Sequence, residues 1–172
     1  MGADMDRVLI VATMDTKGRE VAYLQACLEM AGVPTSILDA GIRGKSPVPV
    51  AVDRETVAQT AGMPLKAVQA MGHEGEALAV MIDGAVQCAH NFYTQDGFQG
   101  IIGVGGSMGT TLGTAVMRSF PVGFPKVMIS TMASRNTRDF VGTKDILMLH
   151  SVCDLSGLYR ITKKILHNGA MA

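Results

Sequence analysis

The sequence predicts an α/β domain built on a doubly wound, mostly parallel sheet of about five strands, in a Rossmann-like α/β/α arrangement. Short apolar runs of strand length alternate with longer segments of helical periodicity. Strands that alternate with helices pair in parallel through right-handed crossovers. The length of 172 residues suits a single domain, since domains usually have roughly 100 to 200 residues.

The first β-loop-α unit lies at the start of the chain. Val8–Ala12 is a continuous apolar run, typical of a strand that is covered on both faces. Apolar residues then recur at spacings of three, four and three, up to a helix that ends at Gly32: Val21, Leu24, Leu28 and Ala31. After Pro34, Thr35–Ala40 is the second predicted strand.

The middle of the chain is predicted to be mainly helical. Residues 41–49 contain too much Gly and Pro for regular structure, so they are expected to form a loop. Asp53 is suited to cap a short helix that ends near Gly62. Pro64–His90 is predicted to be one helix, weakened by two internal glycines.

Three more strands are predicted in the second half, at Gly100–Val104, Lys126–Thr131 and Asp145–His150. A helix follows the first of them, and residues 135–138 are expected to be a polar loop. A last helix is expected to carry Leu155, Leu158, Ile161 and Ile165. Residues 168–172 show no evident terminal structure, which favours the view that 1–172 is the amino-terminal domain of a longer protein.

Composition excludes several classes of protein. Fifteen basic and fifteen acidic residues balance, so no overall field attracts nucleic acid or an anionic membrane. The hydrophobic content of 48% excludes disorder, and the mean hydropathy of +0.26 indicates further apolar surface, covered by a second subunit or another domain. The three cysteines are scattered and lack metal-ligand spacing. The chain has no apolar run of membrane length, and acidic residues precede its first hydrophobic run. These features predict a cytoplasmic protein.

Ligands of such sheets bind where loops leave the carboxyl ends of the strands. That rule selects four segments of this chain, which are Asp15–Gly18, Asp39–Gly44, Gly105–Thr110 and Thr131–Arg135. Gly41 and Thr131 are the candidate ligand-binding residues of the second and fourth segments. The first and third segments carry more specific chemistry.

The glycine-rich loop between the third predicted strand and its helix predicts a phosphate site. Its candidate residues are Gly105, Gly106, Ser107, Met108, Gly109 and Thr110. Glycines allow positive φ and a close approach of the main chain to a ligand, and the free N–H groups of a helix's first turn point at an anion. The hydroxyls of Ser107, Thr110 and Thr111 are expected to add donors. The alternative is a tight turn that only packs strand on helix.

The same loop has the G-x-S-x-G spacing of a nucleophile elbow, at Gly105, Ser107 and Gly109. A serine hydrolase is therefore the rival enzyme hypothesis. It would need a downstream acid and histidine, for which several candidates exist without distinguishing context: Asp139, Asp145 or Asp154, with His150 or His167. A protein-interaction module with a vestigial pocket is a third possibility.

Asp15, Thr16 and Lys17 open the first predicted helix. Asp or Thr there is an ordinary helix cap. Lys17 is unusual, because a cation in the first turn opposes the helix dipole unless an anion lies nearby. Lys17 is therefore predicted to contact phosphate, and Asp15 to bind Mg²⁺ or anchor a water molecule. The Walker, dinucleotide and HExxH zinc signatures are all incomplete.

Five motifs together resemble the Tm-one-like ATP-binding domain family, which includes a plant protein and many bacterial relatives. They are ATMDTKG (12–18), IGVGGSMGT (102–110), PVGFPKVMISTMAS (121–134), VGTKDI (141–146) and SVCDLSGL (151–158). The resemblance implies an ATP-binding domain that tends to form a homodimer and is usually followed by a second domain. It places the triphosphate near Asp15–Lys17 and Gly106–Gly109.

Three positions depart from the family pattern. Met108 and Arg135 stand where glycine is common, and Glu74 stands where an arginine is common. A carboxylate at Glu74 near phosphates is expected to weaken ATP binding or to favour another phosphorylated ligand. The leading hypothesis is a cytoplasmic domain that binds ATP with Mg²⁺, with no assigned catalytic base.

Overall fold

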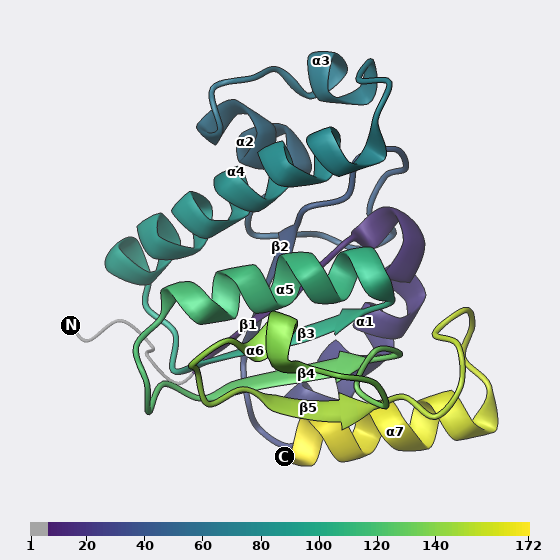
Figure 1. Ribbon diagram of the computed structural model, residues 1–172. Helices are drawn as coiled ribbons and strands as arrows, with labels where there is room; N and C mark the ends of the chain where they lie inside the picture. Colours follow the sequence, from purple (N-terminus) through teal and green to yellow (C-terminus); the bar gives the residue numbers. More distant parts are fainter. Residues whose placement is uncertain (1–6) are drawn as a thin grey trace.

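A five-stranded parallel sheet forms the centre of the computed structural model, which describes residues 7–172 (Figure 1). The acidic start of the chain, residues 1–6, lies outside the described part. The strand order is β2-β1-β3-β4-β5. The bounds are β1 Val8–Ala12, β2 Thr35–Asp39, β3 Gly100–Gly105, β4 Lys126–Ser130 and β5 Leu147–His150. The predicted α/β fold and all five strands are confirmed, with ends within two residues of the prediction.

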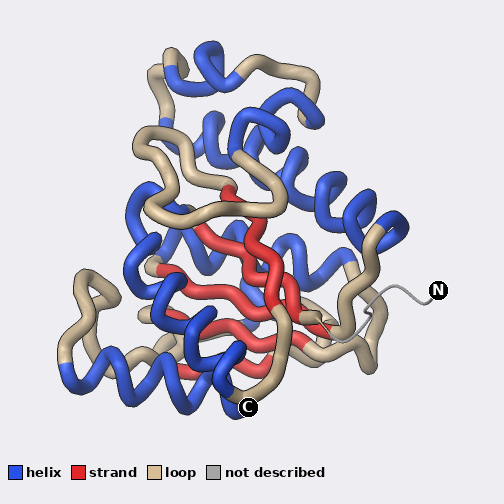
Figure 2. Tube along the Cα trace, turned by 180° about the vertical axis from the view of Figure 1, so that it is seen from behind, coloured by secondary structure: helices blue, strands red, loops and turns tan. Residues whose placement is uncertain are grey.

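Seven helices surround the sheet within residues 7–172. They are α1 Met14–Met30, α2 Arg54–Thr60, α3 Leu65–Gln69, α4 Glu74–Gln95, α5 Ser107–Ser119, α6 Arg138–Val141 and α7 Arg160–Met171. One core lies between the sheet and α1 with α7, and the other lies between the sheet and α4 with α5. Figure 2 shows the sheet from behind, on the side opposite α5. Successive residues of β1 alternate between the two cores, as a doubly covered strand requires.

The packing of α5 on β3 depends on a glycine in the strand. A Cβ on Gly103 would lie 2.6 Å from Sδ of Met128 and 3.3 Å from Cε of Met117. Only glycine leaves room for these two methionines between helix and sheet. The close fit lets the last part of α5 pack against the middle of β3.

Two helix predictions are wrong. The predicted helix Pro64–His90 is broken at residues 70–73 into α3 and α4, because His73 is extended at φ −118° and ψ 117° and begins a new helix. The last helix begins at Arg160, not at Leu155, because Gly157 has φ +114° and interrupts the helical pattern. Leu155 is instead buried in a loop ahead of α7.

Two further expectations change near the end of the chain. The polar loop at 135–138 leads into the short helix α6, which packs on α5. Residues 168–171, for which no structure was expected, continue α7. Gly169 packs so closely on β4 that a Cβ there would lie 2.4 Å from Cδ1 of Ile129. The end of α7 is thus part of the core of this domain.

Candidate functional site

Three helices begin around one pocket at the carboxyl edge of the sheet. The amino-terminal ends of α1, α4 and α5 lie on the same side of the molecule (Figure 1). The pocket has a volume of about 510 Å³, within the range of roughly 300 to 1,000 Å³ of ligand sites. Each helix amino terminus carries a partial positive charge, so their convergence favours an anion.

The pocket has a polar end and an apolar end. The first turn of α1 and the start of α5 supply the polar end, with Thr13, Asp15, Thr16, Lys17, Ser107 and Gly109. The loop after β2 and the helices α3 and α4 supply the apolar end, with Ala40, Ile42, Val68, Met71, Ala77 and Leu78. The pocket is also lined by Gly106 and Met108, and by the polar side chains of Arg43, Gln69 and Glu74. The arrangement suits a ligand with an anionic part and a flat or apolar part.

The glycine-rich loop uses close packing and not positive φ. The φ angles of Gly105, Gly106 and Gly109 are not positive. The expectation that these glycines are needed for positive φ is therefore wrong. A Cβ on Gly105 would lie 2.7 Å from Cα of Gly109 and 2.6 Å from its carbonyl carbon. Gly105 therefore lies behind the pocket wall and lets the first turn of α5 approach β3.

The first turn of α5 presents free amides. The first hydrogen bond of the helix joins N of Thr110 to O of Gly106 at 2.8 Å. The amides of Ser107, Met108 and Gly109 have no acceptor among residues 7–172, and these three residues line the pocket. Three main-chain donors are thus available to a ligand.

The hydroxyls of Thr110 and Thr111 do not face the pocket, contrary to expectation. Thr110 is fully buried, and its hydroxyl donates to O of Gly106 and lies 2.6 Å from Oγ of Ser130. The Thr111 hydroxyl donates to O of Ser107 at 3.0 Å. Thr131 also lies behind the loop, where its amide donates to O of Gly105. These residues support the loop.

Lys17 reaches the pocket from the first turn of α1. Its ammonium donates to O of Leu155 at 2.7 Å, and the half-buried side chain also lines the pocket. Thr13 occupies the N-cap position of the helix without a capping hydrogen bond from its side chain, so Asp15 is not the cap. Two N–H groups of the ammonium remain available, since Lys carries three donors.

Two aspartates join α1 to the loop after β2. Oδ2 of Asp15 accepts from the amides of Ile42 and Arg43, at 3.0 and 2.9 Å. Oδ1 of Asp39 accepts from the amides of Met14 and Gly41, at 3.0 and 2.8 Å. The support role of Asp39 was not predicted, because its partner Met14 is 25 residues away in the sequence.

Gly41 fits between the two carboxylates. A Cβ there would lie 2.9 Å from Oδ1 of Asp15 and 3.0 Å from Oδ1 of Asp39. Oδ1 of Asp15 is buried and has no hydrogen-bond partner within the described part of the chain. Buried polar oxygens without a partner are rare, so this atom is suited to meet a cation or a bound water molecule.

Burial raises the pKa of the Asp39 carboxyl, and the nearby Asp15 charge adds to the effect. The amides of Gly41 and Met14 and the charge of Arg54 act in the opposite direction without cancelling it. The folded state therefore binds a proton more tightly than the unfolded chain. Stability is lost as pH rises from the usual value of 3.8 through the raised folded pKa.

We expect Asp39→Asn to be more stable than wild type at pH 7, by on the order of 1 kcal/mol. The amide oxygen of Asn still accepts from Met14 and Gly41, and the buried charge is gone. Urea unfolding at pH 7 and at pH 4 measures the difference, which should shrink on acidification as Asp39 becomes protonated in wild type. An advantage that grows at low pH would contradict the assigned direction.

A surface ion pair lies at the rim of the pocket. Nη2 of Arg43 is 3.3 Å from Oε1 of Glu74, and the two side chains are 80% and 71% exposed. Exposed pairs of this kind contribute little stability. Lys17 and Arg43 balance Asp15 and Glu74, so the formal charge of the pocket lining is zero.

The structure does not assemble a serine hydrolase. No histidine lines the pocket, and His150 ends β5, two strands away from β3. A nucleophile elbow holds its serine in a strained turn, whereas Val152 is the only non-glycine residue with positive φ in residues 7–172. Ser107 simply begins α5.

Residues 7–172 lack two other kinds of feature. No helix in that range has the length and apolarity to cross a membrane. No group of three or more His, Cys, Asp or Glu side chains is placed to hold a metal ion there. Any metal at Asp15 would therefore need oxygens from a ligand or water as well.

Comparisons with known proteins identify the relatives of this chain. The model of the N-terminal domain of the uncharacterised protein family UPF0261 matches residues 6–172. UPF0261 proteins from Rhizobium meliloti and Clostridium tetani are 40% and 37% identical over 168 and 166 residues. These alignments cover 98% and 96% of this chain and 41% of each relative.

A plant protein also matches. The ToMV susceptible protein tm-1(GCR26) of Solanum lycopersicum is 38% identical over 98 residues, which cover 57% of this chain and 13% of that protein. The resemblance to the Tm-one-like family is thus confirmed. The chain spans about two fifths of the length of its bacterial relatives.

Proposed function

This chain belongs to the uncharacterised protein family UPF0261, in its N-terminal domain, and from that premise and the pocket we propose a nucleotide-binding function, with ATP and Mg²⁺ as the preferred ligand. The main support for the proposal is that Lys17 and the free amides of Ser107–Gly109 line the same pocket. The rest of the pocket is mainly apolar, with Arg43, Gln69 and Glu74 as its polar residues, and this combination suits a nucleoside.

The phosphates would bind at the polar end. Four donor groups are available there: the amides of Ser107, Met108 and Gly109 and the ammonium of Lys17. Hydrogen bonds to charged groups each contribute roughly 1.5 to 3 kcal/mol net. After the loss of translational and rotational freedom, such a set supports about micromolar affinity, near 8 kcal/mol.

The residues present also fit a magnesium ion. The lining carries no net charge, so a triphosphate needs additional positive charge. Oδ1 of Asp15 is a buried acceptor without a partner in the described chain, and it is suited to hold a cation. Mg²⁺ usually binds one or two carboxylates together with phosphates and water, and bound there it would neutralise phosphate charge. No residue is assigned to a reaction.

Calorimetric titration with Mg-ATP tests the proposal, with adenosine at the same Mg²⁺ concentration as the matched control. ATP should release heat with a Kd in the micromolar range, and adenosine should bind far more weakly because it lacks the phosphates. No heat at millimolar Mg-ATP would contradict nucleotide binding. Absence of nucleotide binding together with a stable oligomer would favour a protein-interaction module.

We also propose that the domain is a cytoplasmic homodimer that serves or regulates the region that follows it in the relatives. The high mean hydropathy supports a second apolar interface. The three cysteines are unpaired, as a reducing compartment requires. Sedimentation velocity across protein concentrations tests the dimer, and a monomer at all concentrations would refute it.

Glu74→Arg is expected to tighten Mg-ATP binding about three- to tenfold at low salt, because it replaces a negative rim charge with a positive one. Stability should change by less than about 0.5 kcal/mol, since the Arg43–Glu74 pair is exposed. Titration at two salt concentrations measures the effect, which should fade at high salt. Glu76→Arg is the control, because Glu76 is exposed in the same first turn of α4 as Glu74 but does not line the pocket. An equal gain in both variants would point to net charge alone.

A further inference from the structure

Residues 151–159, the loop between β5 and α7, are clamped to α1 at two points. The Lys17 ammonium donates to O of Leu155, and Oε1 of Glu20 accepts from the amide of Gly157. Lys17 and Glu20 are three residues apart, so they lie on the same face of the helix. One face of α1 therefore holds two main-chain groups of this loop, the carbonyl of Leu155 and the amide of Gly157.

The clamp uses groups that are costly to bury alone. Glu20 is 3% exposed, so its carboxylate depends on the Gly157 amide for solvation. Leu155 is fully buried in the core between the sheet and α1 with α7. Release of the clamp would leave the Glu20 carboxylate without that donor and would free the Lys17 side chain.

The loop itself is held in an unfavourable backbone conformation. Val152 has φ +64°, which β-branched residues rarely adopt, and Gly157 has φ +114°. In Figure 1 the loop projects on the same side of the molecule as the amino-terminal ends of α1 and α5. The docked loop is thus maintained by its contacts and not by local preference.

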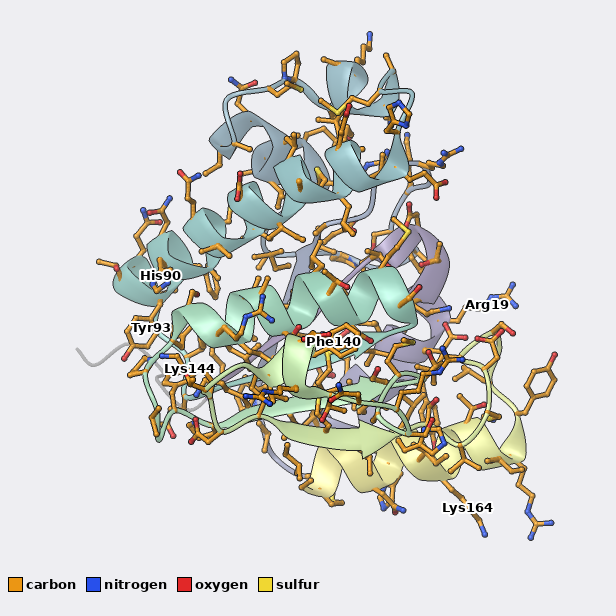
Figure 3. All side chains as sticks on the ribbon, viewed as in Figure 1. Arg19, His90, Tyr93, Phe140, Lys144 and Lys164 are labelled. Carbon is orange, nitrogen blue, oxygen red and sulfur yellow. The ribbon has the colours of Figure 1, made fainter. Side chains whose placement is uncertain are left out.

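A second cavity separates part of the loop from α1. It has a volume of about 490 Å³ and lies between Arg19, Lys45 and Tyr159. Arg19, labelled in Figure 3, projects from α1 on this side. This cavity shares Asp15 and Thr16 with the nucleotide pocket, so the two cavities adjoin on either side of the first turn of α1. The loop therefore has free space beside it.

We propose that the 151–159 loop is coupled to occupation of the nucleotide pocket through Lys17, with Glu20 as the positioning residue that docks the loop. This inference rests on the proposed function. A docked loop holds the Lys17 side chain in place, so a phosphate meets an ammonium whose rotamer freedom is already lost. By thermodynamic reciprocity, a bound phosphate favours the docked loop to the same extent.

Hydrogen exchange of peptides from 151–159 tests the coupling in the intact chain, with and without saturating Mg-ATP. Exchange in wild type should slow on addition of ATP. Glu20→Ala should exchange faster without ligand and bind Mg-ATP at least about fivefold more weakly. Glu20→Gln should restore binding to within about twofold of wild type, because its amide oxygen still accepts from Gly157. Lys164→Met, on the exposed side of α7, is the control and should match wild type.

The outcomes separate this inference from the function on which it rests. If ATP binds but leaves loop exchange in wild type unchanged, the coupling is refuted and nucleotide binding stands; this result needs no variant. If Glu20→Ala exchanges faster yet binds ATP as tightly as wild type, the positioning role is refuted. If wild type gives no heat with Mg-ATP, the proposed function fails and the coupling fails with it.

Discussion

Gly105→Ala is expected to destabilise the protein by about 1 to 3 kcal/mol and to weaken Mg-ATP binding more than about tenfold. The added Cβ would lie 2.6 Å from the carbonyl carbon of Gly109 and 2.9 Å from N of Thr110. Both are main-chain atoms, so the first turn of α5 must move away from β3. That movement displaces the three free amides from the pocket. Urea unfolding and calorimetry measure the two effects separately.

Gly106→Ala is the control for this prediction. At Gly106 a Cβ would meet only Oγ1 of Thr131, at 3.9 Å, which is ordinary contact, and φ is −77°. Its stability should stay within about 0.5 kcal/mol of wild type. If both variants lose the same stability, general effects of alanine explain the loss and not the close approach of Gly105 to α5.

The strands could be predicted because each is a short apolar run between loop residues. Val8–Ala12 is apolar throughout, and both of its faces are indeed covered. The helix errors arose where apolar periodicity continues through a break. The predicted helix Pro64–His90 joined two helices across residues 70–73, and the apolar spacing of Leu155, Leu158 and Ile161 continued through Gly157. Periodicity alone does not detect such a change of direction.

The polar end of the site was predictable because it depends on short local patterns in the sequence. A lysine in a helix's first turn is unfavourable without an anion, and a strand followed by glycines is suited to phosphate. The contacts that support these residues were not predictable. Leu155 is 138 residues from Lys17, and nothing in its apolar side chain shows that its carbonyl holds an ammonium. Its periodicity indicated a helix instead.

The hydroxyl side chains of the glycine-rich loop show a second limit of sequence-based prediction. Ser107 and Thr110 are equivalent donors in the sequence, but Ser107 is the exposed first residue of α5, whereas Thr110 lies further along the helix. Ser107 lines the pocket, whereas Thr110 is fully buried against Ser130. Which hydroxyl faces a ligand depends on where the helix begins, and the ends of helices are the least certain part of a sequence-based assignment.

Lys17→Met is expected to weaken Mg-ATP binding about 10- to 100-fold, because a hydrogen bond from a charged group contributes roughly 1.5 to 3 kcal/mol. Met keeps the length of the side chain in the half-buried position, and the loss of the bond to O of Leu155 should cost stability as well. Calorimetry gives the affinity and urea unfolding gives the stability.

Lys45→Met is the control, since Lys45 is exposed and lies beside the pocket without lining it. Long-range attraction by surface charge is screened at moderate salt, so Lys45→Met should bind within about twofold of wild type at that ionic strength. Equal losses in the two variants would mean that Lys17 acts only through the overall field and makes no direct contact with phosphate.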